Sequence, residues 1–132
     1  MKREINILPA DTFVVVNRTI LNESDRKIIS MLYQPIIGCI ATDLYYTLWT
    51  DLDKTELLSG EYTHHHLMTS LRVKMDSIVT ARKKLEGVGL LKTFVKKGDV
   101  NNYVYEMFSP ISASEFFNHP ILNIVLYNNI GV

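Results

Sequence analysis

The chain has 132 residues, enough for one domain, and its 47% hydrophobic composition is sufficient for a core. Lys+Arg and Asp+Glu both number 14, so the net charge excludes no class of partner. The single cysteine, Cys39, excludes an internal disulfide, and the sequence contains neither an 18-residue apolar run nor a signal peptide. These features predict a cytoplasmic protein.

The N-terminal half is predicted to hold one strand and two helices. Residues 1–11 have no clear period and are expected to form a loosely held arm before a single domain at 12–132. A β-branched run at 12–19 predicts a strand that adds to the edge of a later hairpin and makes a three-stranded sheet. The polar cluster at 22–25 predicts the cap of a helix over 24–35 that ends at Pro35. After Gly38, apolar residues at helical spacing predict a helix over 38–52.

Neither a metal site nor a catalytic site is predicted. His64, His65 and His66 are adjacent, but neighbouring helix positions point about 100° apart, whereas helical zinc pairs need spacings of three or four. One or two of these histidines are expected on the surface of a helix over 64–71. Asp51 and Asp53 are expected to belong to a solvated acidic surface rather than to act as paired acids. Because no phosphate-binding loop or nucleophile elbow occurs, the sequence predicts no enzyme and no cofactor.

The stretch at 74–108 carries the most informative pattern. Ile78, Ala81, Leu85 and Val88 form one apolar stripe, which predicts a helix over 76–88. At Gly89 the pattern changes to extended runs of branched and aromatic residues, which predict a hairpin over 91–108 with a turn at 96–102. A basic helix followed by a basic-tipped hairpin is typical of a winged helix, an α+β fold. The same pattern also occurs in α+β domains that bind nothing.

Positive charge is concentrated in this stretch. Residues 72–97 hold eight basic side chains against two acidic ones, which is compatible with an anionic partner or with an acidic face of a neighbouring subunit. For a DNA-binding domain, the helix would enter a groove and the hairpin turn would touch phosphate. Arg82 can instead form a structural ion pair with Glu86 at i+4. The candidate DNA-binding residues are Thr80, Arg82, Lys83, Lys84, Lys96 and Lys97.

The C-terminal residues are predicted to form a short helix capped by Ser114 and a last helix that begins near Pro120. Apolar residues cover nearly all sides of the last helix, and a helix near the chain end is hard to bury on all sides within so small a domain. A partner subunit could cover the remaining face, so the sequence predicts a homo-oligomer. The candidate interface residues are Phe116, Phe117, Ile121, Leu122, Val125, Leu126 and Tyr127.

Five stretches together resemble a known family. In order, they are Ser24-Asp25-Arg26-Lys27-Ile28-Ile29, Leu32-Tyr33-Gln34-Pro35-Ile36-Ile37-Gly38, Thr63-His64-His65-His66-Leu67-Met68, Lys84-Leu85-Glu86-Gly87-Val88-Gly89-Leu90-Leu91-Lys92 and Leu122-Asn123-Ile124-Val125-Leu126-Tyr127-Asn128. Over about residues 7–131 the chain resembles the N-terminal domain of the primosomal DnaB proteins of Gram-positive bacteria. These are replication initiation and membrane attachment proteins related to DnaD, and are distinct from the replicative helicase that shares the name.

The resemblance implies a winged helix used chiefly for self-assembly, as a dimer or tetramer, in a protein that helps to load the replicative helicase at the origin or at restart sites. It implies a DnaD-like protein, a helicase loader and the replicative helicase as partners in primosome assembly, and peripheral membrane association. It also implies that DNA binding lies mainly in C-terminal domains, which would begin where this chain ends. The alternative is a stand-alone DNA-binding winged helix, such as a transcriptional regulator.

Overall fold

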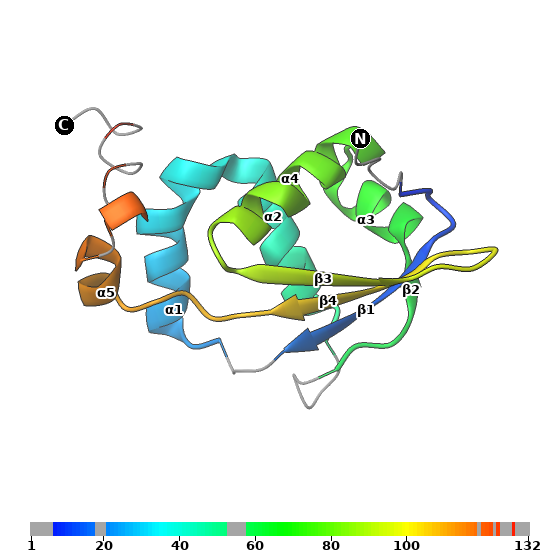
Figure 1. Cartoon of the computed structure of the whole chain (residues 1–132), viewed down its shortest axis with the longest axis horizontal. Coiled ribbons are helices and arrows are strands. Elements are labelled where there is room, and N and C mark those ends of the chain that lie inside the picture. The colour runs from blue at the N-terminus through cyan, green and yellow to red at the C-terminus, as the bar shows by residue number, and fades with distance from the viewer. Residues whose placement is uncertain are drawn as a thin grey trace.

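The computed structural model describes residues 7–17, 21–52, 58–118, 120–122, 124 and 128, and at 113, 114 and 117 it describes the backbone alone. Figure 1 shows helices packed on one side of a small sheet, with a hairpin that projects beyond them. In chain order the elements are β1 Thr12–Asn17, α1 Glu23–Ile28, the π-helical segment η1 Ile29–Tyr33, α2 Gln34–Thr50, β2 Tyr62–Thr63, α3 His64–Leu71, α4 Met75–Gly87, β3 Leu91–Lys96, β4 Asn102–Met107 and α5 Ala113–Asn118.

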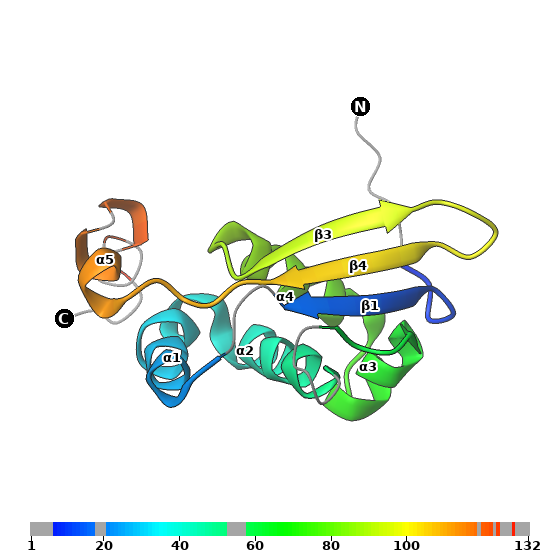
Figure 2. The same ribbon diagram turned by 90° about the horizontal axis from the view of Figure 1, so that it is seen from below.

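The sheet has four strands in the order β2-β1-β4-β3. β3 and β4 pair antiparallel along their whole length and form the predicted hairpin. β1 lies beside the hairpin, as predicted, and pairs parallel with β4. It is not an edge strand, because the two-residue β2 pairs with its other side. The prediction of a three-stranded sheet was therefore wrong, because it lacked β2. Two residues are too few to show the alternation of apolar and polar residues that identifies a strand. β3 forms one edge of the sheet (Figure 2).

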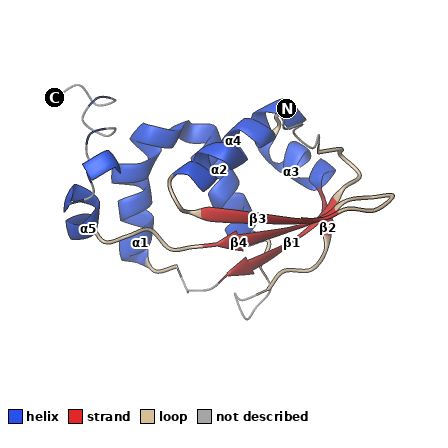
Figure 3. Ribbon diagram, in the orientation of Figure 1, coloured by secondary structure: helices blue, strands red, loops and turns tan. Residues whose placement is uncertain are grey.

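Alternation along the strands separates a covered face from an open face of the sheet. Every second residue of β1 is buried, including Phe13 and Val15, and β4 buries Tyr103, Tyr105 and Met107 in the same way. Successive strand residues point to opposite faces, so these side chains share the face that packs against the helices. Figure 3 shows α2, α3 and α4 on this one side of the sheet, while α1 and α5 lie beyond its end.

The helical segments from α1 to α2 are continuous up to a break at Gly38. Asn22 caps α1 in a capping box: its side chain accepts from the Asp25 amide, and the Asp25 carboxylate accepts from the Asn22 amide. The prediction that the helix ends at Pro35 was wrong, because the helical run continues through this residue, which directly follows the π-helical segment η1 at the start of α2. The break comes at Gly38 instead, whose φ of 84° lies in the region that favours glycine.

By length and composition, the run Glu23–Thr50 is apolar enough to cross a membrane. In this structure η1 and α2 contribute buried side chains to the core of the domain, whereas α1 contributes none. Gly38 interrupts the run, and α2 packs on α4 with a row of side chains at helical spacing that are buried in the protein. The buried residues of α2 are Ile37, Ala41, Thr42, Leu44, Tyr45 and Leu48.

The turn from α4 into β3 confirms the predicted change of period. α4 ends at Gly87, and Gly89 has a φ of 81°, which lets the chain turn sharply into β3. The buried side of α4 carries Ile78, Ala81 and Leu85, the predicted stripe. The order of α2, α3, α4 and the β3–β4 hairpin, the wing, makes this α+β domain a winged helix.

Residues 7–11 are packed rather than loosely held, which corrects the prediction for this part of the arm. Ile7 is buried in the core. The buried Asp11 carboxylate accepts hydrogen bonds from the amides of Leu8 at 2.8 Å and Asn101 at 3.1 Å, and so ties the segment to the turn between β3 and β4. The remainder of the predicted arm, and residues 18–19 of the predicted first strand, lie outside the described residues.

Candidate functional site

The outer surface of α4 presents three of the candidate DNA-binding residues. Thr80, Lys83 and Lys84 are exposed, on the side of the helix turned away from the buried stripe. Their spacing of three and four positions places Thr80 next to both lysines on the helix surface. α4 therefore carries a short polar and basic strip near its C-terminal end.

Arg82 does not belong to this strip. Its side chain is only 16% exposed, and its Nε lies 3.8 Å from Glu86 Oε1 one turn further along α4. It borders a small internal space lined by the core side chains Leu44 and Tyr105. A guanidinium held among apolar groups is costly to leave without a counter-ion. This position fits the structural ion pair with Glu86 rather than a contact with DNA.

Lys96 and Lys97 are exposed at the tip of the wing, and they do not form one cluster with the α4 lysines. β3 begins just after the C-terminal end of α4 and runs away from it (Figure 1). Six residues of strand span about 20 Å, so the tip lies a strand length from the turn that ends α4. The structure thus separates the predicted basic residues into a helix group and a wing group.

A groove of about 390 Å³ opens between α2 and α4 beside the α4 strip. The α2 side contributes Ile37, Ile40 and the exposed Cys39, while Thr80 and Lys84 stand on the α4 side. The predicted helix surface for DNA is therefore hollowed and partly apolar. Sequence reasoning missed this groove because it depends on the break at Gly38, which directs the start of α2 relative to α4.

The three adjacent histidines have three different environments. His64 is completely buried: its Nδ1–H donates to the Asp11 carbonyl oxygen at 2.7 Å, and its Nε2 accepts from the Tyr105 hydroxyl. Burial lowers the pKa of His64 below its ordinary value, with the Asp11 carbonyl opposing that effect. His65 is exposed, as expected for one or two of the three. The described part of the chain contains no group of three His, Cys, Asp or Glu side chains that could hold a metal ion.

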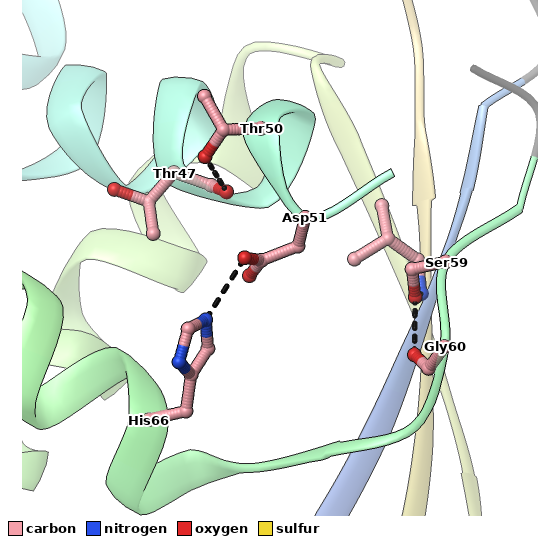
Figure 4. Close-up of polar contacts among 7 residues, drawn as sticks. Thr47, Thr50, Asp51, Ser59, Gly60 and His66 are labelled. Carbon is pink, nitrogen blue, oxygen red and sulfur yellow. Dashed lines mark hydrogen bonds and ion pairs between the residues drawn. The ribbon is translucent and has the colours of Figure 1, made fainter. Parts of the chain in front are cut away.

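His66 reaches across from α3 to the C-terminal end of α2, as Figure 4 shows. Its Nε2 lies 2.8 Å from Asp51 Oδ1, and its ring stacks on Tyr62 with centroids 4.6 Å apart. Burial raises the pKa of Asp51 above its ordinary value, while the hydrogen bond and charge of His66 act in the opposite direction. Asp51 is thus a partly buried structural contact instead of a solvated acid, and Asp53 lies outside the described residues.

Around this contact, backbone carbonyls accept from side-chain hydroxyls (Figure 4). Thr50 Oγ1 donates to the Thr47 carbonyl at 2.8 Å, and Ser59 Oγ donates to the Gly60 carbonyl at 2.7 Å. Ser59 Oγ also accepts from the Val15 amide at 2.7 Å. These hydroxyls are engaged in holding the end of α2 and the segment before β2, so they form no nucleophile paired with His66.

The candidate interface residues divide between the core and the surface. Phe116 is 0% exposed and packs edge to face on Tyr33, with ring centroids 5.2 Å apart, so it belongs to the core of this chain rather than to a free face. Leu122 is partly buried against the same core. Ile121 and Ile124 are 67% and 60% exposed. The Phe117 side chain, Val125, Leu126 and Tyr127 lie outside the described residues.

Comparisons with known proteins give a consistent result. The family model for the DnaB N-terminal winged helix domain matches residues 7–132. Over 128 residues the chain is 31% identical to the replicative helicase loading/DNA remodeling protein DnaB of Staphylococcus aureus, covering 96% of this chain and 28% of that protein. The crystal structure of primosome protein DnaB (residues 1–300) from Geobacillus stearothermophilus matches with a TM-score of 0.86 and 37% identity, covering 95% of this chain and 48% of that one.

This chain therefore spans less than half the length of either relative. The match to the family model begins at Ile7, the first residue that the structure places in the core, and it includes the helices, the wing and the C-terminal segment. On the strength of a match over nearly the whole chain and of the shared fold, the chain belongs to the family of DnaB N-terminal winged helix domains.

Proposed function

We propose that this domain is the assembly domain of a bacterial replication initiation protein that takes part in loading the replicative helicase during primosome assembly. Two relatives that share its fold or sequence are named as a helicase loading protein and a primosome protein. The proposal concerns a role in binding and assembly, without catalysis by this domain.

The observation that carries the proposal is a pair of exposed aliphatic side chains after α5. They lie on a C-terminal helix, of which residues 120–122, 124 and 128 are described. Ile121 and Ile124 are three residues apart, so they point to the same side of the helix. Burying a large aliphatic side chain is worth about 1.5–3 kcal/mol, and a symmetric contact uses each residue twice. Such a contact offsets much of the entropy lost on association.

Leu122 and Phe116 support the proposal indirectly. Phe116 anchors the preceding helix α5 in the core, and Leu122 is partly buried against the same core, while Ile121 and Ile124 remain exposed. A helix held in this way is preorganised for a partner subunit, so little ordering entropy remains to be lost on binding. The proposed assembly is a homo-oligomer, a dimer or tetramer, whose further partners are a DnaD-like protein, a helicase loader and the replicative helicase. A cytoplasmic location with peripheral membrane association belongs to the same proposal.

A second candidate function is binding of duplex DNA through α4. It is favoured by the exposed Lys83 and Lys84 beside Thr80. If these lysines contact phosphates, Lys83→Glu with Lys84→Glu should weaken binding equally for all duplex sequences, and affinity should fall steeply with salt. Lys27→Glu on α1 is the matched control. Absence of duplex binding at low salt would remove this function and leave the assembly role intact.

The assembly proposal is tested in the complete protein with purified partners. Ile121→Asp with Ile124→Asp should abolish deposition of the helicase on forked DNA, while the exposed Met31→Asp on η1 should leave it unchanged. Circular dichroism of both variants establishes that the fold is retained. Full helicase deposition by a folded double variant would contradict the proposed role of this surface.

A further inference from the structure

The sheet has an open face that none of the functions above uses. Strand register places three cross-strand rows on this face, opposite to the buried tyrosines of β4. α2, α3 and α4 all pack on the other side (Figures 1 and 3). Along β3 the open face carries Lys92, Phe94 and Lys96, and the rows continue with Glu106, Val104 and Asn102 on β4 and with Val16, Val14 and Thr12 on β1.

Phe94 is the central feature of this face. Its side chain is 47% exposed, although large aromatic side chains are usually buried. The Lys92 ammonium lies 5.3 Å from the centre of its ring, and Lys96 follows two residues later on the same face. Both lysines are exposed, and so is Lys97 at the tip. One accessible ring is therefore flanked on each side, along an edge strand, by cations.

Both positive and negative side chains lie near the Phe94 ring, in different positions. Glu106 stands across from Lys92, and Asp99 lies at the tip, so the hairpin as a whole is only weakly basic. Along its own strand the nearest charged neighbours of Phe94 on this face are the two lysines. Its cross-strand partner, Val104, is uncharged. An anionic chain that follows β3 would thus meet cations immediately before and after the ring.

We propose that the open face of the β3–β4 hairpin binds single-stranded DNA, with a base stacked on Phe94 and backbone phosphates held by Lys92, Lys96 and Lys97. A positively charged track with an aromatic platform is how proteins bind single strands without reading sequence. In a duplex the base faces are stacked on each other, so a flat exposed ring gains nothing from the paired form. This binding does not depend on assembly through the C-terminal helix. It rests on the proposed function only in that a replication initiation protein works on DNA.

The position of the hairpin favours this occupant. The wing projects beyond the helical layer in both views (Figures 1 and 2), so a strand can lie along β3 without meeting another element of the domain. Val95 and Val100 are also exposed near the tip. Exposed valines beside lysines are also found on surfaces that insert into anionic lipid, so lipid binding is one arm of the test.

The test is fluorescence anisotropy of a labelled dT20 oligonucleotide and of its duplex, titrated with the 132-residue chain at low and moderate salt. Phe94→Ala should weaken single-strand binding by about 5- to 150-fold, which is the loss of affinity expected when one base no longer stacks on an aromatic ring. Phe94→Leu should lose most of the same affinity because it keeps the apolar surface but has no flat ring, whereas Phe94→Trp should retain it. Lys96→Gln with Lys97→Gln should weaken binding and reduce the salt slope by about 0.7 per lysine.

Matched controls are available on the opposite part of the domain. Met31→Ala removes an exposed apolar side chain from η1, and Lys27→Gln removes an exposed charge from α1. Both variants should bind dT20 as the unchanged chain does. Circular dichroism confirms the fold of each variant, and sedimentation equilibrium of the same samples reports assembly separately, so that failure here is distinguishable from failure of the assembly role.

Three results would overturn the proposal. The first is no binding of dT20 at low salt, and the second is binding that Phe94→Ala leaves unchanged. The third is binding to vesicles of phosphatidylserine and phosphatidylcholine that requires Phe94 while dT20 does not bind, which would assign the hairpin to lipid.

Discussion

The buried His64 imidazole joins α3 to the segment before β1, since its Nδ1 lies 2.7 Å from the carbonyl oxygen of Asp11. Its other ring nitrogen accepts from Tyr105 on β4, and burial raises the pKa of that phenol, which keeps its proton available as a donor. A neutral His64 can satisfy both bonds. A protonated His64 would present an N–H to a hydroxyl that already donates, inside the core.

This arrangement predicts a loss of stability in mild acid. The pKa of His64 is lowered in the folded chain, so the unfolded chain takes up a proton first as the pH falls below about 6.5. The stabilising contribution is complete above that pH and decreases as pH falls toward the folded pKa. Denaturant unfolding between pH 8 and 5 should show a decline that His64→Gln reduces.

His65→Gln provides the control for this prediction, because His65 is exposed on the same helix. Its unfolding free energy should follow that of the unchanged chain at every pH. The measurement stays above pH 5 because the raised pKa of Asp51 acts with the opposite sign in stronger acid. An unchanged slope in His64→Gln would show that this imidazole is not the titrating group.

The break in the helical run predicts a backbone effect at Gly38. Its φ of 84° and ψ of 171° fall in a region open essentially to glycine alone, and a Cβ built there meets nothing within 4 Å. Gly38→Ala should therefore lower the unfolding free energy by about 1–3 kcal/mol through backbone strain alone. Gly87→Ala, where φ is not positive and space is also open, should instead raise it by about 0.5–1 kcal/mol.

Chemical denaturation of the two glycine variants measures this difference directly. Equal effects of Gly38→Ala and Gly87→Ala would mean that the chain passes position 38 as an ordinary helix. In that case the groove between α2 and α4 would not depend on the break.

The placement of Phe116 predicts a stability effect without an assembly effect. It is fully buried against Tyr33, so Phe116→Ala should cost about 3–5 kcal/mol of unfolding free energy. Ile121→Ala, at an exposed position, should change the stability of the monomer by less than about 0.5 kcal/mol. Urea denaturation at low protein concentration gives both values. A small loss in Phe116→Ala together with a weaker oligomer would place Phe116 at an interface after all.

Hydrophobic periodicity was sufficient to predict most of the fold. The stripe on α4, the change of period at Gly89 and the position of β1 beside the hairpin were predicted from the pattern of apolar residues, whereas the parallel direction of β1 was not. Pro35 was a misleading signal because proline usually ends a helix, whereas here the helical run continues from η1 through Pro35 into α2. A two-residue strand such as β2 is defined by its partner rather than by its own sequence.

The candidate site was harder to predict, because it depends on which side of an element a residue faces. The sequence left Arg82 open either to a contact with DNA or to an ion pair with Glu86, and only its burial in the structure separates it from the exposed Lys83 and Lys84. The sequence placed Phe94 in a strand without giving its face, and its exposure follows from the register with Val104 and from the lack of a covering helix among the described elements. The sequence did not show which of the three histidines is buried, and the contacts of His64 with Asp11 and Tyr105 identify it.

Assembly through the C-terminal helix is tested most directly by sedimentation equilibrium of the 132-residue chain beside its Ile121→Asp, Ile124→Asp variant. A carboxylate at a buried apolar contact is strongly disfavoured, so the unchanged chain should sediment as a dimer or tetramer and the variant as a monomer. The variant should keep its helical circular dichroism because Phe116 and Leu122 still pack in the core. An unchanged chain that is monomeric at all concentrations, or a double variant that remains oligomeric, would contradict the claim.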